Sequence, residues 1–337
     1  MRKPMNKLLP LGFVLLLSFY SANAQIYRVA EMNTDQIRAL DKQKTVVILT
    51  GGVLEEHGPH LPSFTDGYSN EWLTRKLADA IAARPGWAVL VFPTIPVGHG
   101  GANEIGGKLS FPGTYSLRRS TLRSVYMDLA GELGEQGFRW VFVVFGHGAP
   151  HNNLMLDQAG DFFRDTYNGR MVHLRGLQPT KEQLAALSLT PPDLLLSEAE
   201  KKEIGSLDLH AGFEETSRLL FVRPDLVSSN YLKLPSLTAN HPGDFMQFGQ
   251  PGWAGYLGSP RLATAKAGKQ LQEFRAVRDA ALTFAIIDGR LDERDVPRYA
   301  TVTIAAAAAA KLPDLVAKNE QAIAQKQRDW MKNKGIE

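Results

Sequence analysis

Short runs of β-branched and aromatic residues alternate with longer amphipathic segments in the first half of this chain, and that alternation limits the possible folds more than any other feature. Apolar side chains at helical spacing separate the runs, as expected of helices between buried strands. The sequence predicts strands at 45–50, 87–92, 140–145 and 171–174, and helices at 72–81, 122–133 and 153–167. Connections of this length imply right-handed crossovers. We therefore expect an α/β protein whose central, mostly parallel sheet is flanked by helices.

The rest of the chain is less regular. We expect a surface helical insert at about 178–203, an irregular segment at 225–260, and helices at 261–289 and 304–331. Pro313 is expected to break the last of these helices. Because there is no internal repeat and no clear linker, we predict one domain over 25–300 and a C-terminal helical extension over 301–337.

The first 24 residues have the layout of a secretory signal peptide. A basic start precedes an apolar stretch, 8–20, and a run of small residues that ends at Ala24. A membrane anchor is the alternative, but the apolar stretch is shorter than the ~20 residues that a spanning helix needs. We expect cleavage before Gln25, no stable membrane insertion afterwards, and an exported protein, periplasmic or secreted.

Charge and cysteine content exclude several classes of protein. Removing residues 1–24 removes three cations and no acid, so the formal net charge falls from +3 to zero. Without a basic surface we expect no nucleic-acid partner. The chain has no cysteine, which excludes disulfides, a thiolate nucleophile and cysteine-bound metal. Any metal must therefore be bound by histidine and carboxylate side chains.

Acidic and imidazole side chains follow two of the predicted strands. Glu55 and His57 come after the first strand, and Asp66 follows a proline-containing loop. His147 comes directly after the third strand. The carboxyl ends of parallel strands are where α/β sheets bind ligands, and oxygen and imidazole ligands suit Zn, Mn or Fe. This convergence indicates a divalent metal site, although a solvated acidic turn and hydrogen-bonded structural histidines also fit the separate pieces.

A third group of residues, Asp-Leu-His-Ala-Gly-Phe-Glu-Glu-Thr-Ser, opens a predicted helix at 208–217. Together with Glu-x-His-Gly-Pro-His-Leu-Pro…Thr-Asp and Gly-His-Gly, it resembles the creatininase (creatinine amidohydrolase) family, with the motifs in the same order. Two further segments resemble pieces of that family, Phe-Pro-Gly-Thr at 111–114 and Gly-x-x-Gly-Ser-Pro-x-x-Ala-Thr at 255–264. The resemblance covers roughly residues 44–270.

The resemblance implies a three-layer α/β fold and a metal-dependent amidohydrolase site with one or two divalent ions, in a homo-oligomer such as a hexamer. By position, the family's metal ligands fall on Glu55, His57, Asp66 and His147. Asp66 falls on the bridging ligand, and Glu215 on an acid that either binds metal or orients water. His210 falls beside the scissile amide, where it would pass a proton from the attacking water to the leaving nitrogen. The implied reaction cleaves a C–N bond in a cyclic amide, a formamide or a similar small molecule.

The sequence departs from the family pattern around these residues. Ala149 stands where an acid would complete the second metal site, so Glu215 or water must replace that acid, or a single ion binds tightly. The asparagine expected beside Gly-His-Gly is displaced to Asn152 or Asn153. A glycine-rich loop, 98–107, replaces the family's segment before Phe-Pro-Gly-Thr. These loops shape the substrate pocket, so the substrate need not be creatinine.

Two other functions are consistent with the sequence. The first is peptide trimming, in which Trp253, Tyr256 and the loop 99–107 line a longer groove, unless the two aromatic residues pack in the core. The second is a non-catalytic, exported metal- or ligand-binding protein. Such a protein has no need for His210 together with Glu215, which favours an enzyme.

Overall fold

The computed structural model describes residues 25–100, 112–240, 252–301, 303 and 312–336. These residues form one sheet of five strands in the order β1-β3-β2-β4-β5. The strands are β1 (Gln25–Arg28), β2 (Thr45–Thr50), β3 (Ala88–Val91), β4 (Trp140–Val144) and β5 (Arg170–His173). All four strand pairs are parallel, which confirms the predicted sheet.

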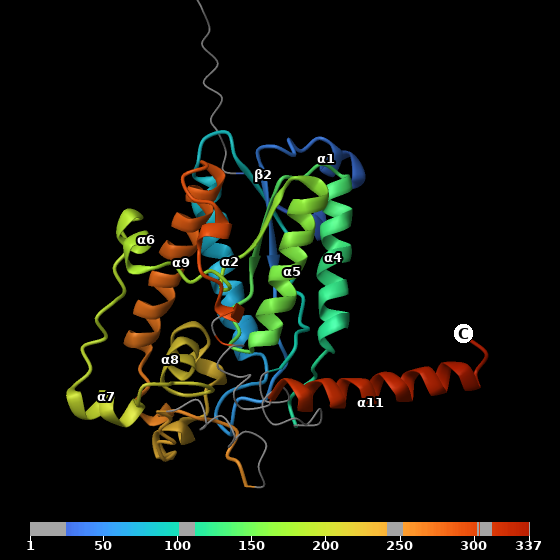
Figure 1. The fold of residues 1–337 in the computed structure, drawn as a ribbon. Coiled ribbons are helices and arrows are strands. Elements are labelled where there is room, and N and C mark those ends of the chain that lie inside the picture. The colour runs from blue at the N-terminus through green and yellow to red at the C-terminus, as the bar shows by residue number, and fades with distance from the viewer. Residues whose placement is uncertain (1–24, 101–111, 241–251, 302, 304–311, 337) are drawn as a thin grey trace, which may run out of the picture.

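Helices cover both faces of the sheet, with α2 and α9 on one side and α4 and α5 on the other (Figure 1). The α-helices are α1 (Thr34–Arg38), α2 (Thr65–Ala82), α4 (Arg119–Glu135), α5 (Pro150–Tyr167), α6 (Lys181–Ala186), α7 (Glu198–Ile204), α8 (Phe213–Val222), α9 (Ala265–Ile287) and α11 (Leu312–Asn333). Short 3-10 helices lie at Val29–Glu31, Pro224–Leu226, Ser229–Lys233, Pro260–Leu262 and Glu293–Asp295. The molecule is therefore the three-layer α/β protein that the sequence predicts.

The central strands explain why both layers are needed. Successive side chains of a strand point to opposite faces, so β2, which is buried along its whole length, must be covered twice. Val46 and Ile48 pack in the core formed with α2 and α9, whereas Val47 and Leu49 pack in the core formed with α4 and α5. The two cores hold the sheet rigidly, so the loops at the strand ends have fixed starting points.

The prediction from sequence missed the strand β1 and the short helix α1, and it placed the start of α2 too late. The strand β1 is polar and exposed, and it pairs only with β3 at the edge of the sheet, so no buried apolar run marks it. The helix α2 begins at Thr65 rather than near Trp72, because the side chain and the backbone N–H of Thr65 both donate to the carbonyl of Pro62. Asp66 therefore lies in the first turn of α2 and not in a loop.

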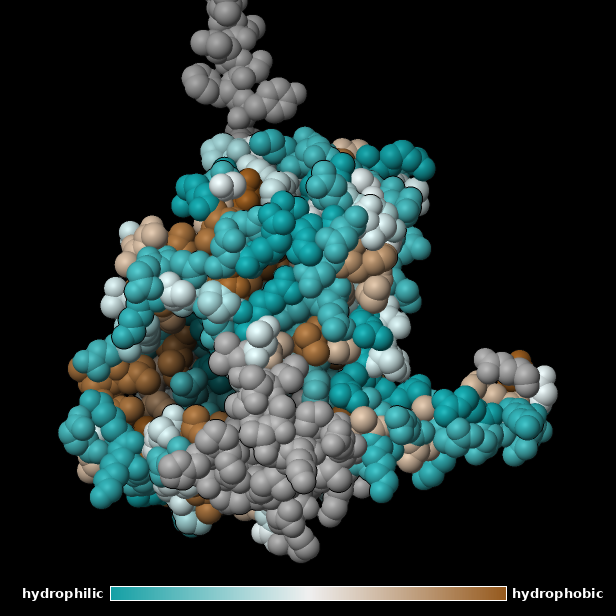
Figure 2. Space-filling model, viewed as in Figure 1, coloured by the Kyte–Doolittle hydropathy of each residue, from teal (hydrophilic) through white to brown (hydrophobic). Residues whose placement is uncertain are grey.

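The surface segments agree with the expected irregular second half. The segment 178–203 contains α6 and begins α7, and Leu195 between them is 71% exposed. Figure 2 shows apolar side chains on the left of this face, over the connection between the two helices. The helix α11 extends away from the body (Figure 1) and is described from Leu312. Because residues 304–311 lie outside the described residues, the expected break at Pro313 stays a prediction.

Some predicted features lie outside the described residues. These are the signal segment 1–24, residues 101–107 of the glycine-rich loop, Phe111 and residues 304–311. Within the part that the structure describes, no helix combines the length and the apolar character needed to cross a membrane.

A close crossing of two helices fixes the position of α8. A Cβ atom placed on Gly268 of α9 would lie 1.8 Å from the backbone oxygen of Ser217 on α8. The hydroxyl of Ser217 in turn accepts a hydrogen bond from the backbone N–H of Thr264 at 3.1 Å, just before α9 begins. Only glycine permits this approach, and the first turn of α8 depends on it.

We expect Gly268→Ala to lower the free energy of unfolding by about 1–3 kcal/mol, because the added methyl group meets backbone that cannot move aside. Gly131 in α4 is the matched control, since its Cβ would make only an ordinary 3.6 Å contact with Tyr167. Gly131→Ala should raise stability by about 0.5–1 kcal/mol, the usual gain for this change inside a helix. Urea denaturation measures both, and equal effects of the two substitutions would contradict the close crossing.

Candidate metal centre

The sequence-predicted ligands meet at the carboxyl end of the sheet. Glu55 and His57 lie in the loop after β2, and His147 follows β4, which is the neighbour of β2. Asp66 and Glu215 lie in the first turns of α2 and α8, where the helix dipole favours a negative charge. Segments far apart in sequence thus bring five potential ligands to one place, and four of them are buried.

Three overlapping groups of these side chains have the geometry to hold an ion. In each group the ligand atoms all lie within 4.8 Å of one another. The groups are Glu55 with Asp66 and His147, His57 with Asp66 and Glu215, and Glu55 with His57 and His210. Asp66 belongs to two of them, as a residue that bridges two ions would. In the second group, Glu215 supplies the acid for which the sequence offers only Ala149.

The imidazole rings are held in the orientation that a metal ligand needs. Nδ1 of His57 faces the backbone carbonyl of Glu55 at 3.0 Å, and a carbonyl can only accept, so this nitrogen carries the hydrogen. Nε2 of His57 is then free to bind an ion, and it is buried without a hydrogen-bond partner, 3.6 Å from a carboxylate oxygen of Glu215. In His147, Nε2 faces the carbonyl of His99 at 3.0 Å and leaves Nδ1 for the ion. Metal-binding histidines are held in this way, so the residues present fit a divalent cation.

The buried carboxylates of the cluster are stabilised by nearby positive charge. Nδ1 of His147 lies 2.8 Å from Asp66 and 3.5 Å from Glu55. Burial alone would lower the pKa of His147, but these two carboxylates raise it to about 9. Burial would likewise raise the pKa of Asp66, yet the hydrogen bond and charge of His147 lower it to about 2. The proton on His147 balances part of the negative charge of these carboxylates. A divalent ion bound at the same place would balance it as well.

His210 lies against the cluster rather than within its centre. Its Nε2 is 2.7 Å from the backbone oxygen of Glu56 and 3.0 Å from the carboxylate of the same residue. Its ring centroid is 4.5 Å from that of His57. Burial opposes protonation, but Glu55, Glu56 and Glu215 together raise the pKa of His210 to about 10. No role is predicted for Glu56 from the sequence, because it is the variable position x in the Glu-x-His motif formed by Glu55 and His57.

The position of Glu215 depends on strained backbone. The residue after His210, Ala211, is buried and has a φ of 49°, a left-handed conformation that is uncommon for a side chain other than glycine. Its N–H donates to a carboxylate oxygen of Glu215 at 2.7 Å. Burial would raise the pKa of Glu215, but the charge of His57 lowers it, so this side chain is a carboxylate at neutral pH.

The remaining motifs support the ligand loops. The hydroxyl of Thr114 accepts from the N–H of Glu56 at 2.9 Å. Leu257 exchanges two backbone hydrogen bonds with His210, at 2.8 and 3.1 Å. The displaced asparagines are used in the same way, because Asn153 donates to the carbonyl of His147 and Asn152 accepts from the N–H of His99.

A small cavity of about 110 Å³ opens beside the cluster. Its walls include Asp66, His147, His210 and Glu215, together with residues that no sequence motif indicated: Arg175, Arg218, Arg275 and Tyr299. Of the two aromatic residues predicted to line a groove, Trp253 lies beside the ring of His210, at 6.1 Å between centroids. Tyr256 is 1% exposed and donates to the carbonyl of Pro235, which fits the alternative that it packs in the core.

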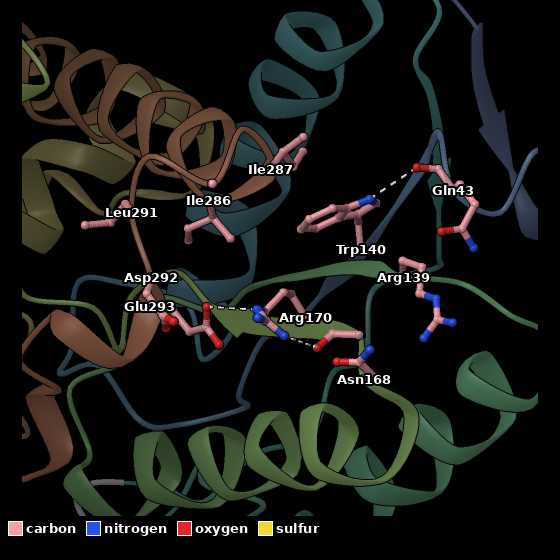
Figure 3. Close-up of a pocket in the computed structure, with 12 residues that line it drawn as sticks. Gln43, Arg139, Trp140, Asn168, Arg170, Ile286, Ile287, Leu291, Asp292 and Glu293 are labelled. Atoms are coloured by element: carbon pink, nitrogen blue, oxygen red, sulfur yellow. Dashed lines mark hydrogen bonds and ion pairs between the residues drawn. The ribbon is translucent and has the colours of Figure 1, made fainter.

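A larger cavity, of about 530 Å³, lies at the amino ends of β4 and β5 (Figure 3). Its polar side chains bind one another or nearby backbone. Arg170 lies 3.3 Å from Glu293 and donates to the carbonyl of Gly169, and Trp140 donates to the carbonyl of Gln43. Among the described residues, every group able to hold an ion lies at the opposite end of the sheet. Cavity size therefore does not locate the chemistry in this molecule.

Comparison with known proteins agrees with the fold and the motifs. The chain is 28% identical over 188 residues to a creatinine amidohydrolase of Pseudomonas putida, which covers 54% of this chain and 66% of that protein. It is 27% identical over 248 residues to a mycofactocin precursor peptide peptidase of Mycolicibacterium smegmatis, which covers 71% of this chain and 85% of the relative.

Solved structures show the same architecture. A structure described as "Creatininase Mn" aligns with a TM-score of 0.54 at 23% identity, covering 79% of this chain and 99% of its own. A creatinine amidohydrolase crystal structure aligns with the same TM-score, covering 77% and 96%. The family model for creatininase, described as creatinine amidohydrolase, matches residues 30–282. The chain therefore belongs to the creatininase family.

Proposed function

We propose that the protein is a metal-dependent amidohydrolase that cleaves a C–N bond in a cyclic amide, a formamide or a similar small molecule. The observation that carries this proposal is the set of three overlapping ligand groups, two of which share Asp66. One or two divalent ions bound there would polarise the substrate carbonyl and make water a better nucleophile at neutral pH. The cavity beside the cluster is well below the ~300–1,000 Å³ usual for sites that bind drug-sized ligands, which favours a small substrate or a small part of a larger one.

The chain's own residues divide the proton transfers between them. Glu215 is a carboxylate at neutral pH and faces the cluster. With a single ion held by Glu55, Asp66 and His147, it would be placed to accept a proton from the attacking water. His210 holds a proton that it can donate to the leaving nitrogen, and Glu56 keeps its ring in place. A general acid and a general base within one cluster are what hydrolysis of an unreactive amide requires. This division refines the prediction that His210 alone passes the proton.

We expect Asp66→Asn to remove the bound metal and to lower the hydrolysis rate at least ~100-fold, because Asp66 is shared by two ligand groups. Elemental analysis of purified protein measures the metal, and circular dichroism checks that the chain is folded. A chelator should abolish activity in the wild type, and added zinc or manganese should restore it. Stoichiometric metal in a folded Asp66→Asn variant would contradict the proposed site.

For His210→Gln we expect retained metal and a kcat lower by about 10²–10⁴-fold, the usual contribution of a proton donor. His173→Gln is the matched control, since His173 is equally buried at the end of β5 but binds the carbonyl of Phe145. The control should leave kcat nearly unchanged. Loss of metal from the His210 variant would instead assign this side chain to the ligand set with Glu55 and His57.

Peptide cleavage is the second candidate function. It is favoured by one observation, the longer alignment with the mycofactocin precursor peptide peptidases, which extends over 85% and 86% of two such relatives. A screen of lactams, hydantoins, formamides and short peptides with metal-loaded protein separates the candidates. We expect turnover of small amides; cleavage confined to peptides would overturn the proposed substrate class while leaving the metal chemistry intact.

We also propose that the protein is exported to the periplasm or secreted and that it forms a homo-oligomer. Export is supported by the signal-like pattern of residues 1–24. Mass spectrometry of the N-terminus in cell fractions tests the cleavage before Gln25, and light scattering measures the oligomeric state.

A further inference from the structure

Three arginine side chains line the wall of the cavity beside the ligand cluster. Arg175 comes two residues after β5, Arg218 lies on α8 one turn after Glu215, and Arg275 lies on α9. No motif in the sequence connects them, and the proposed hydrolysis does not use them. They come together because the end of β5 and the packed helices α8 and α9 meet at this cavity.

Two of these arginines have no carboxylate partner. Among the described residues, neither Arg175 nor Arg275 lies within ion-pair distance of an acid, and Nε of Arg275 is buried without a hydrogen-bond partner. Burial, together with the neighbouring arginines, lowers the pKa of Arg275 to about 9 and also lowers that of Arg175. A charge that is partly removed from water and has no acid partner is unfavourable, and a bound anion would relieve that cost.

Two other arginines of this fold, Arg278 and Arg298, bind carboxylates. Arg278, one turn from Arg275 on α9, binds Asp279 at 3.0 Å and the carbonyl of Leu174 at 3.2 Å. Arg298 binds both carboxylate oxygens of Asp161 at 2.8 Å. Arg175 and Arg275 differ from these two in having no acid partner among the described residues, and both line the cavity of the candidate metal centre.

The acids of the cavity wall do not neutralise these arginines. Asp208 accepts the backbone N–H groups of Phe213 and Glu214 at 2.9 and 2.6 Å, and so caps α8. Glu214 lies 3.5 Å from Arg218, and Glu215 lies 3.6 Å from the same residue. Arg218 is thus partly neutralised, whereas Arg175 and Arg275 keep their full charge for a ligand.

Both guanidinium groups are held in place. Arg175 lies over the ring of Tyr299, 5.4 Å from its centroid, and the hydroxyl of Tyr299 donates to the carbonyl of Gly148. Arg275 packs against Gly146, where Nη2 lies only 2.1 Å from the position that a Cβ atom would take. Since Gly146 and Gly148 flank His147, an anion on these arginines lies next to a candidate metal ligand.

We propose that Arg175 and Arg275, with Arg218 beside them, form a binding subsite for an oxyanion, a carboxylate or phosphate group carried by the amide substrate. This inference rests on the proposed amide hydrolysis and narrows it to anionic substrates. Guanidinium groups bind both oxyanions through paired hydrogen bonds, and the small cavity suits a compact group. The anion would hold the substrate while its amide lies over the ligand cluster.

Calorimetry with zinc-loaded protein and three matched probes tests the subsite. N-Acetylglycine carries a carboxylate, N-acetylaminomethylphosphonic acid a phosphonate, and N-acetylglycinamide no charge. We expect the better of the two anions to bind about 10- to 100-fold more tightly than the neutral amide, as for hydrogen bonds to charged groups. Whichever anion binds more tightly identifies the oxyanion. In Arg175→Gln and Arg275→Gln the preference should fall towards unity, with zinc content unchanged.

Thermal stability distinguishes an anion-binding role of Arg275 from a purely structural one. In the absence of anions, Arg275→Gln should melt at the same temperature as the wild type or higher, because it removes an unpaired charge. Arg278→Gln is the matched control on α9; it breaks an ion pair, so it should lower the melting temperature and leave the probe preference intact. Arg290→Gln, at an exposed site, controls for the change in net charge. Should Arg275→Gln not fold, Arg175→Gln makes the same test from another element.

The outcomes separate this inference from the proposed function. Equal binding of charged and neutral probes by the wild type, or a preference that survives in the Arg175→Gln/Arg275→Gln double variant, would overturn the subsite even if small amides are hydrolysed. Arginine-dependent binding of N-acetylglycine without hydrolysis of any amide would support the subsite and reject the hydrolase.

Discussion

Negative charge concentrated at one edge of the sheet is the constraint on which the rest of this molecule depends. The carboxylates of Glu55, Asp66 and Glu215 lie within coordinating distance of shared points and are largely removed from water. Such a group is unstable unless positive charge lies between its members. In the structure His147 and His210 respond by holding protons well above the ordinary pKa of histidine. A divalent ion would balance the same carboxylates with more charge and a fixed coordination geometry. The residues present therefore favour metal binding.

The fold keeps this unfavourable arrangement together by making the surrounding backbone rigid. The strands β2 and β4 are neighbours with both faces buried, so the loops that begin at their ends cannot move apart. The helix α8 is held against α9 at Gly268, which fixes Glu215 from the opposite side. Even the strained residue Ala211 serves this end, since its N–H holds the Glu215 carboxylate. Elements from distant parts of the chain thus hold the potential ligands close together at one end of the sheet.

The sequence predicted what local patterns encode. Apolar runs located four strands, and the position of Glu55, His57 and His147 after two of those strands was enough to predict that the side chains meet. The strand β1 was missed because it is polar and lies at the edge, where pairing with β3 rather than burial defines it. Arg175 and Arg275 gave no signal, because they are near each other only after β5 and α9 have packed. Roles that arise from such packing leave no periodic or motif pattern in the sequence.

The two sides of the cavity carry opposite charges, so a substrate with one anionic end would bind in one orientation. The ligand cluster is acidic until ions fill it, whereas Arg175 and Arg275 remain cationic throughout. Ions bound at the cluster would offset its negative charge, and the arginines would then attract the proposed anionic substrate before any specific contact forms. The arginines would hold the anion in preference to the ions only if their hydrogen bonds fit it better, and a planar guanidinium can form two parallel hydrogen bonds with an oxyanion. A substrate held by its anionic group at the arginines would have its amide held over the ligand cluster. This fixed orientation of the reacting groups would raise the rate of hydrolysis. On this argument the unpaired arginines lower the stability of the empty protein in order to position the substrate.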